Sequence, residues 1–140
     1  MMPIDEMTHD ELRREIAERL GWRDLDITTW WEESYESDPY EAEILTGTSP
    51  LGNTKVRVPN WPEDANAALE LCRQIALDTQ WVFSLTWVWN EPKPYGWSVF
   101  FEHRTDELAY LHLHYGHAAT PALACARSAL AALRDTEASS

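Results

Sequence analysis

Three consecutive segments rich in aromatic and β-branched residues constrain the fold most. They span Trp81–Trp89, Trp97–His103 and Leu108–Tyr115. Such residues favour strands, and the Asn, Pro and Gly residues between the first two segments favour a turn. Alternation in the third segment places His112 and His114 on one face of a strand. We therefore predict a three-stranded antiparallel meander.

Helices are predicted before and after this meander. Thr8 and Glu11 have the spacing of a capping box at the start of the first helix. Gly21 suits the end of that helix, because glycine adopts the left-handed conformation without a Cβ clash. The last helix is predicted to begin at Thr120-Pro121, where proline favours the first turn.

A further helix is predicted between residues 60 and 79. Asn60 is its expected N-cap, with Glu63 in the reciprocal position. The apolar residues that share one face at helical spacing are Ala65, Ala68, Leu69, Cys72 and Ala76. We expect this face to be buried.

The segment from residue 30 to residue 53 is acidic and rich in turn-forming residues. Gly47, Pro50 and Gly52 fall within it, and the part before Ile44 holds acids and aromatic rings without a basic residue. We interpret it as a long loop or insertion. The following Lys55–Val58 alternates, and Pro59 closes it, which indicates a short edge strand.

The order of these elements predicts an α+β fold. Strands in one block, flanked by helices, favour an α-β-α sandwich, in which a small antiparallel sheet is packed by three helices. The sheet is the three-stranded meander plus the edge strand. A chain of 140 residues has the length of a single domain, so we expect one domain over 1–140, with a disordered tail at 135–140.

The charge of the chain limits the classes of partner that we expect. The formal net charge is -13, and more than half of the 24 acidic residues precede residue 44. Nonspecific binding to nucleic acid or to an anionic membrane requires basic residues, so we expect neither. A basic protein remains a suitable partner, and no cofactor is predicted.

Cys72 and Cys125 are the two cysteines, and both lie at apolar helix positions. We expect two buried, reduced thiols. The sequence begins without a signal-peptide pattern and has no apolar run of membrane-spanning length. These features predict a cytoplasmic protein.

Four segments in order resemble the phage ABA sandwich domain family. They are Leu20-Gly21-Trp22, Val58-Pro59-Asn60-Trp61, Trp97-Ser98-Val99-Phe100-Phe101 and the helix from Ala119 to Leu130. The resemblance spans nearly the whole chain. It implies a helix–sheet–helix sandwich in a phage or prophage accessory protein, which would act in the cytoplasm of a bacterial host. It brings no catalytic residues.

Catalytic and metal sites are weakly indicated. His112 and His114 would place two imidazoles on one side of a strand, as weak candidates for metal ligands. The competing interpretation, which we favour, is an exposed polar strand face. Adjacent acids such as Glu32 and Glu33 are usually solvated rather than catalytic, so we predict a protein that is not an enzyme.

The 8 tryptophans exceed the needs of a small core, which predicts that some are exposed. We expect a ligand pocket that stacks a planar group on tryptophan rings while basic side chains hold phosphates. Its predicted residues are Trp22, Trp30, Trp31, Lys55, Arg57 and Trp61. This chemistry suits a sponge that sequesters a nucleotide immune signal, and a homo-oligomer is a suitable way to build it.

The acidic segment supports an alternative function. A dense negative surface with aromatic anchors is typical of a protein-interaction module or a nucleic-acid mimic that blocks a basic host protein. The sponge requires a retained nucleotide, whereas the mimic requires a basic partner and salt-sensitive binding.

Overall fold

The computed structural model describes residues 2–32, 40–88, 96–105 and 110–138. These residues form an α+β fold with two three-stranded antiparallel sheets. The chain divides into two compact units. The large unit comprises Met1–Ile16 and Pro59–Ser140, and the small unit comprises Ala17–Val58. Each unit is described by itself.

The large unit contains the predicted meander. Its sheet has the order β4-β5-β6, formed by Val82–Val88, Gly96–Thr105 and Tyr110–Ala118. Both pairings are antiparallel. The third strand extends beyond the predicted end at Tyr115, and the predicted start at Leu108 lies outside the described residues.

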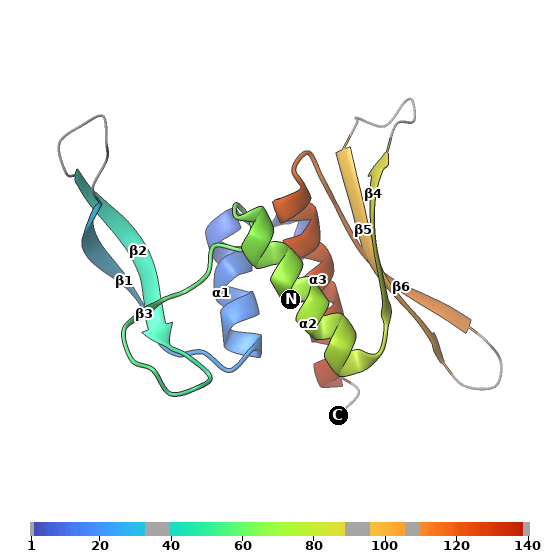
Figure 1. The fold of residues 1–140 in the computed structure, drawn as a ribbon, viewed down its shortest axis with the longest axis horizontal. Coiled ribbons are helices and arrows are strands. Elements are labelled where there is room, and N and C mark those ends of the chain that lie inside the picture. The colour runs from blue at the N-terminus through green and yellow to red at the C-terminus, as the bar shows by residue number, and fades with distance from the viewer. Residues whose placement is uncertain (1, 33–39, 89–95, 106–109, 139–140) are drawn as a thin grey trace. The chain divides into compact units, whose positions relative to one another are not determined.

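Helices α2 (Ala65–Thr79) and α3 (Pro121–Ala138) lie on one side of this sheet (Figure 1). Val99 and Phe101 of β5 are fully buried, and Phe83 and Leu85 of β4 pair with them. These residues of β4 and β5 therefore share the face of the sheet that contains the buried residues. On the other face, Val82 and Tyr115 remain 59% and 57% exposed.

The contact between β6 and α3 requires a residue without a side chain at Gly116. A Cβ at this position would collide with the carbonyl oxygen of Ala124 and lie 2.5 Å from the amide nitrogen of Ser128. The Ser128 hydroxyl donates a 2.6 Å hydrogen bond to the carbonyl oxygen of His114. The strand and the helix therefore pack at backbone distance, which the small residues of α3 permit.

Helix α1 (His9–Arg19) begins as predicted. The Thr8 hydroxyl accepts a hydrogen bond from the amide of Glu11, and the Glu11 carboxylate accepts one from the amide of Thr8. After the helix, Gly21 has a φ of 98°, so the predicted left-handed glycine is confirmed.

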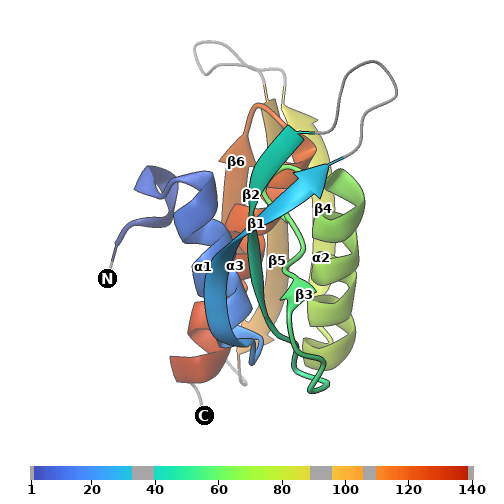
Figure 2. The same ribbon diagram turned by 90° about the vertical axis from the view of Figure 1, so that its left-hand side faces the viewer.

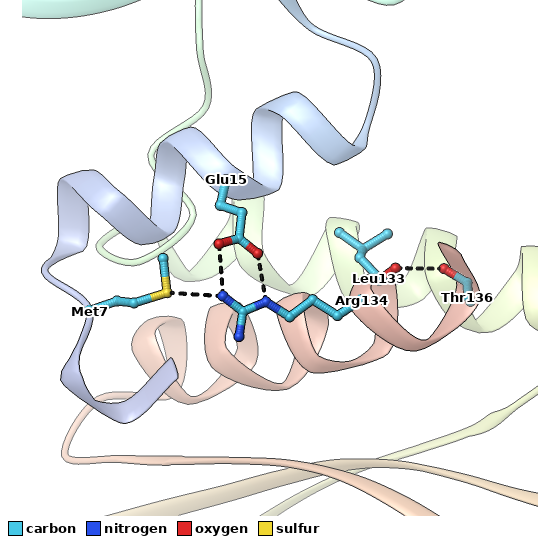
Figure 3. Close-up of polar contacts among 5 residues, drawn as sticks. All are labelled: Met7, Glu15, Leu133, Arg134 and Thr136. Carbon is cyan, nitrogen blue, oxygen red and sulfur yellow. Dashed lines mark hydrogen bonds and ion pairs between the residues drawn. The ribbon is translucent and has the colours of Figure 1, made fainter. Parts of the chain in front are cut away.

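A bidentate ion pair joins α1 to α3. The Nε and Nη2 atoms of Arg134 donate hydrogen bonds of 2.6 and 2.7 Å to the two carboxylate oxygens of Glu15 (Figure 3). The Sδ atom of Met7 lies 3.8 Å from Nη2. Glu15 raises the pKa of Arg134 mainly through these hydrogen bonds. The pair fixes the N-terminal helix on the last helix.

Helix α2 begins later than predicted. Its N-cap is Asp64, whose carboxylate accepts hydrogen bonds from the amides of Asn66 and Ala67. Asn60 instead forms the preceding turn, and its side chain contacts Glu63. Pro62 lies between Asn60 and Asp64. The buried face of the helix also differs from the predicted one. It comprises Ala68, Leu71, Cys72 and Ile75, whereas Leu69 is 38% exposed.

The small unit corrects the prediction of a loop over residues 30–53. Strands β1 (Arg23–Glu32) and β2 (Tyr40–Thr48) form an antiparallel hairpin, and β3 (Val56–Arg57) pairs with the other edge of β2 (Figure 2). The acids on these strands do not prevent pairing, because exposed strand positions tolerate charge. The predicted edge strand is confirmed but belongs to this second sheet.

The predicted disordered tail is also corrected in part. Helix α3 continues to Ala138, and Thr136 caps its own turn with a hydrogen bond to the carbonyl oxygen of Leu133. The ion pair at Arg134 stabilises this last part of the helix. Residues 139–140 lie outside the described residues. No helix in the described ranges is long and apolar enough to cross a membrane.

We predict that Arg134→Met lowers the free energy of unfolding by about 1–3 kcal/mol, because it leaves the partly buried carboxylate of Glu15 without its main partner. Urea denaturation measures this change. Arg73→Met is the matched control, because Arg73 pairs with Glu70 on the exposed surface of α2 and such pairs contribute about 0–1 kcal/mol. Equal losses in the two variants would contradict the structural role of the Arg134 pair.

Candidate functional site

A pocket of about 520 Å³ lies in the small unit. Four threonines are among its lining residues, namely Thr28, Thr46, Thr48 and Thr54. Charged groups of both signs also line it, namely Asp24, Asp26 and Lys55. The volume falls within the range of roughly 300–1,000 Å³ that is usual for small-molecule sites. We take this aspartate–threonine pocket, defined by these residues, as the candidate site.

The pairing of β1 with β2 brings the polar side chains together. Asp26 lies opposite Thr46 in the register, and the hydroxyls of Thr28 and Thr46 share a 2.9 Å hydrogen bond. The Thr48 hydroxyl donates to Oδ2 of Asp24 at 3.2 Å. Hydrogen bonds therefore link the polar side chains on this part of the sheet.

The backbone is irregular where two of the charged residues lie. The β1–β2 register shifts between Arg23 and Asp26, and Asp24 has a φ of 55° within this shift. Lys55 has a φ of 52°. A left-handed conformation costs a non-glycine residue about 1 kcal/mol or more. Both irregular positions line the same pocket, as expected where a backbone directs a side chain toward a site.

Gly47 allows the strands to approach each other beside the pocket. A Cβ on Gly47 would lie 2.9 Å from the carbonyl oxygen of Arg23 and 3.5 Å from the ring of Trp22. Because neighbouring residues of a strand point to opposite faces, Trp22 lies on the face opposite to Thr46 and Thr48. Trp22 is half-buried there and is not part of the pocket lining.

The predicted ligand residues are only partly brought together. Lys55 lines the pocket, and Arg57 is exposed on β3, where it pairs with Thr46 in the register. Trp30 and Trp31 belong to β1, but their side chains lie outside the described residues. Trp61 is 4% exposed and belongs to the large unit, so it has little surface left for stacking.

Sequence reasoning missed most of the pocket. The missed side chains are Asp24, Asp26, Thr28, Thr46, Thr48 and Thr54. A usable signal was present, because polar and apolar residues alternate from Asp24 to Thr28 and so indicate a strand with one polar face. The acidic composition of this part of the chain conceals the alternation.

Of the two predicted metal candidates, His114 makes other contacts in the described structure. The His114 ring stacks on Trp81 with centroids 4.9 Å apart, and its Nε2 lies 3.5 Å from a carboxylate oxygen of Asp135. The side chain of His112 lies outside the described residues. Within the described ranges, no cluster of three or more His, Cys, Asp or Glu residues is arranged to hold a metal ion.

The two cysteines contact each other between α2 and α3. Both are buried and unbridged, and the Cys72 thiol donates a 3.5 Å hydrogen bond to the carbonyl oxygen of Cys125. The interaction with Cys125 and burial raise the pKa of Cys72. Such a thiol remains protonated at neutral pH, which suits a packing role rather than a nucleophilic one.

No protein-family model matches the chain, and no curated protein matches it significantly. The resemblance to the phage ABA sandwich family therefore stays a prediction.

Proposed function

We propose that the chain is a non-enzymatic binding protein that holds a small polar ligand in the aspartate–threonine pocket. The observation that carries this proposal is the combination of four threonine hydroxyls, two carboxylates and one ammonium group around one pocket of suitable volume. These groups supply donors, acceptors and both signs of charge. These groups can form hydrogen bonds and ion pairs with a polar ligand.

The chemistry of the lining supports binding rather than catalysis. Its titratable side chains are two aspartates and a lysine, and its hydroxyls belong to threonines. The hydroxyl of Thr48 contacts Asp24, but a carboxylate is a weak base for activating a hydroxyl nucleophile. The proposal therefore assigns these groups to ligand recognition.

The ligand class predicted from the sequence, a nucleotide signal, draws support from two basic residues. Lys55 lines the pocket and Arg57 lies on the adjacent strand. The resemblance to phage accessory proteins supports the idea that this binding protein acts as an anti-defence sponge in a bacterial host. The lining offers a sugar hydroxyl several partners, but it contains no tryptophan among the described residues.

A second candidate function is an acidic interaction module for a basic host protein. Its support is the exposure of Asp24, Asp26 and Glu43 on the strands of the hairpin. Exposed carboxylates attract basic surfaces and accelerate association, and salt weakens this attraction. The two candidate functions use the same hairpin but require different partners.

We predict that filling the pocket abolishes ligand retention. Thr54 is exposed and lines the pocket, so Thr54→Trp places a large ring there. Native mass spectrometry of protein purified from bacterial cells should show a bound small molecule for the unmodified chain and none for the variant. The neighbouring Asn53→Trp is the control, because Asn53 is exposed and lies outside the pocket lining. Equal retention by both variants would sink the proposed function.

The acidic module predicts a different result. A nonaarginine peptide should bind the unmodified chain in low salt, and the double change Asp24→Asn/Asp26→Asn should weaken that binding. Isothermal titration calorimetry at two salt concentrations measures both effects. Glu70→Gln/Asp78→Asn is the charge-matched control on exposed positions of α2. If the control weakens binding equally, the attraction reflects net charge and the hairpin has no special part in it.

A further inference from the structure

The aspartates and the lysine of the pocket belong to different segments of the chain. Asp24 and Asp26 come from β1, whereas Lys55 precedes β3. The structure shows no ion pair between Lys55 and either aspartate, although all three line one pocket and are among the described residues. The pocket therefore contains two carboxylates and an ammonium group that are not paired with each other.

Each of these groups retains capacity for a ligand. One carboxylate oxygen of Asp24 accepts from Thr48, and one of Asp26 accepts from the amide of Ile27. Within the described part of the chain, the second oxygen of each aspartate has no hydrogen-bond partner, and neither has the Lys55 ammonium. A carboxylate accepts up to about four hydrogen bonds and an ammonium donates three. Most of this capacity is open.

A ligand with a single sign of charge fits this pocket poorly. An anion that contacts Lys55 also faces two carboxylates, and a cation that contacts the aspartates also faces an ammonium group. Like charges in a partly enclosed site repel more strongly than in water. A ligand that carries both signs gains two attractions, and the threonine hydroxyls can serve the polar atoms between them.

We propose that the aspartate–threonine pocket binds a small zwitterion of the amino-acid type. Its ammonium group lies against Asp24 and Asp26, and its carboxylate lies against Lys55. This inference rests on the proposed function, because it requires the pocket to be a ligand site. It replaces the nucleotide as the ligand class, since a phosphate would carry more negative charge toward the two aspartates.

The test compares probes that differ only in charge. A series of ω-amino acids (glycine, β-alanine, γ-aminobutyrate and 6-aminohexanoate) samples the separation between the two charges. n-Hexylamine and hexanoate are the single-charge partners of the longest probe, and n-butylamine and butyrate are those of γ-aminobutyrate. Adenosine monophosphate represents the nucleotide. Binding is measured by isothermal titration calorimetry in a buffer without zwitterions. We expect one ω-amino acid to bind at least about tenfold more tightly than its matched amine and carboxylate.

Two variants assign the charges. Lys55→Met should reduce the affinity for the best zwitterion to that for the matched amine, because it removes the positive group while keeping an unbranched side chain of similar length. Asp24→Asn/Asp26→Asn should reduce it to that for the matched carboxylate, and asparagine tolerates the left-handed conformation at residue 24. Circular dichroism confirms that each variant remains folded.

The outcomes separate this inference from the proposed function. If an amine binds as tightly as the zwitterion, or if adenosine monophosphate binds most tightly and depends on Lys55, the zwitterion is wrong while the pocket remains a ligand site. If no probe binds but Thr54→Trp still removes a ligand retained from cells, the zwitterion is again wrong. If that variant changes nothing, the proposed function fails as well.

Discussion

The antiparallel register of β1 and β2 is the constraint on which the candidate site depends. It places Asp26 opposite Thr46 and allows the Thr28 and Thr46 hydroxyls to bond at 2.9 Å. A shift of one residue would move these side chains to the other face of the sheet. The irregular register beside Arg23 then turns Asp24 into the same pocket. The proposed binding site in the small unit thus depends on strand pairing.

The large unit has a different organisation, in which packing dominates. Gly116 lets β6 approach α3 at backbone distance, and the Glu15–Arg134 pair fixes α1 on the same helix. The His114 ring stacks on Trp81, and Cys72 and Cys125 are buried in the same unit. These contacts of the large unit are structural, while the carboxylates and the ammonium group that we assign to binding belong to the small unit.

The sequence predicted elements that depend on local signals. The Thr8–Glu11 capping box, the left-handed Gly21 and the β4-β5-β6 meander are all present. The prediction was wrong for the β1–β2 hairpin, because the acidic composition before residue 44 indicated a loop and the strand pairing is a tertiary contact that composition does not show. Of the six predicted ligand residues, Lys55 lines the pocket. The other lining residues were not predicted, because contacts such as that of Asp24 with Thr48 depend on a strand register that composition does not reveal.

The central claim is that the small unit binds a small polar ligand in the aspartate–threonine pocket. The most direct measurement is the change in backbone amide NMR shifts when a filtered small-molecule extract of bacterial cells is added to the full chain. The account predicts that the largest changes fall on Asp26, Thr46, Thr48 and Lys55, which line the pocket. Changes confined to β4, β5 and β6, or no changes at all, would contradict it.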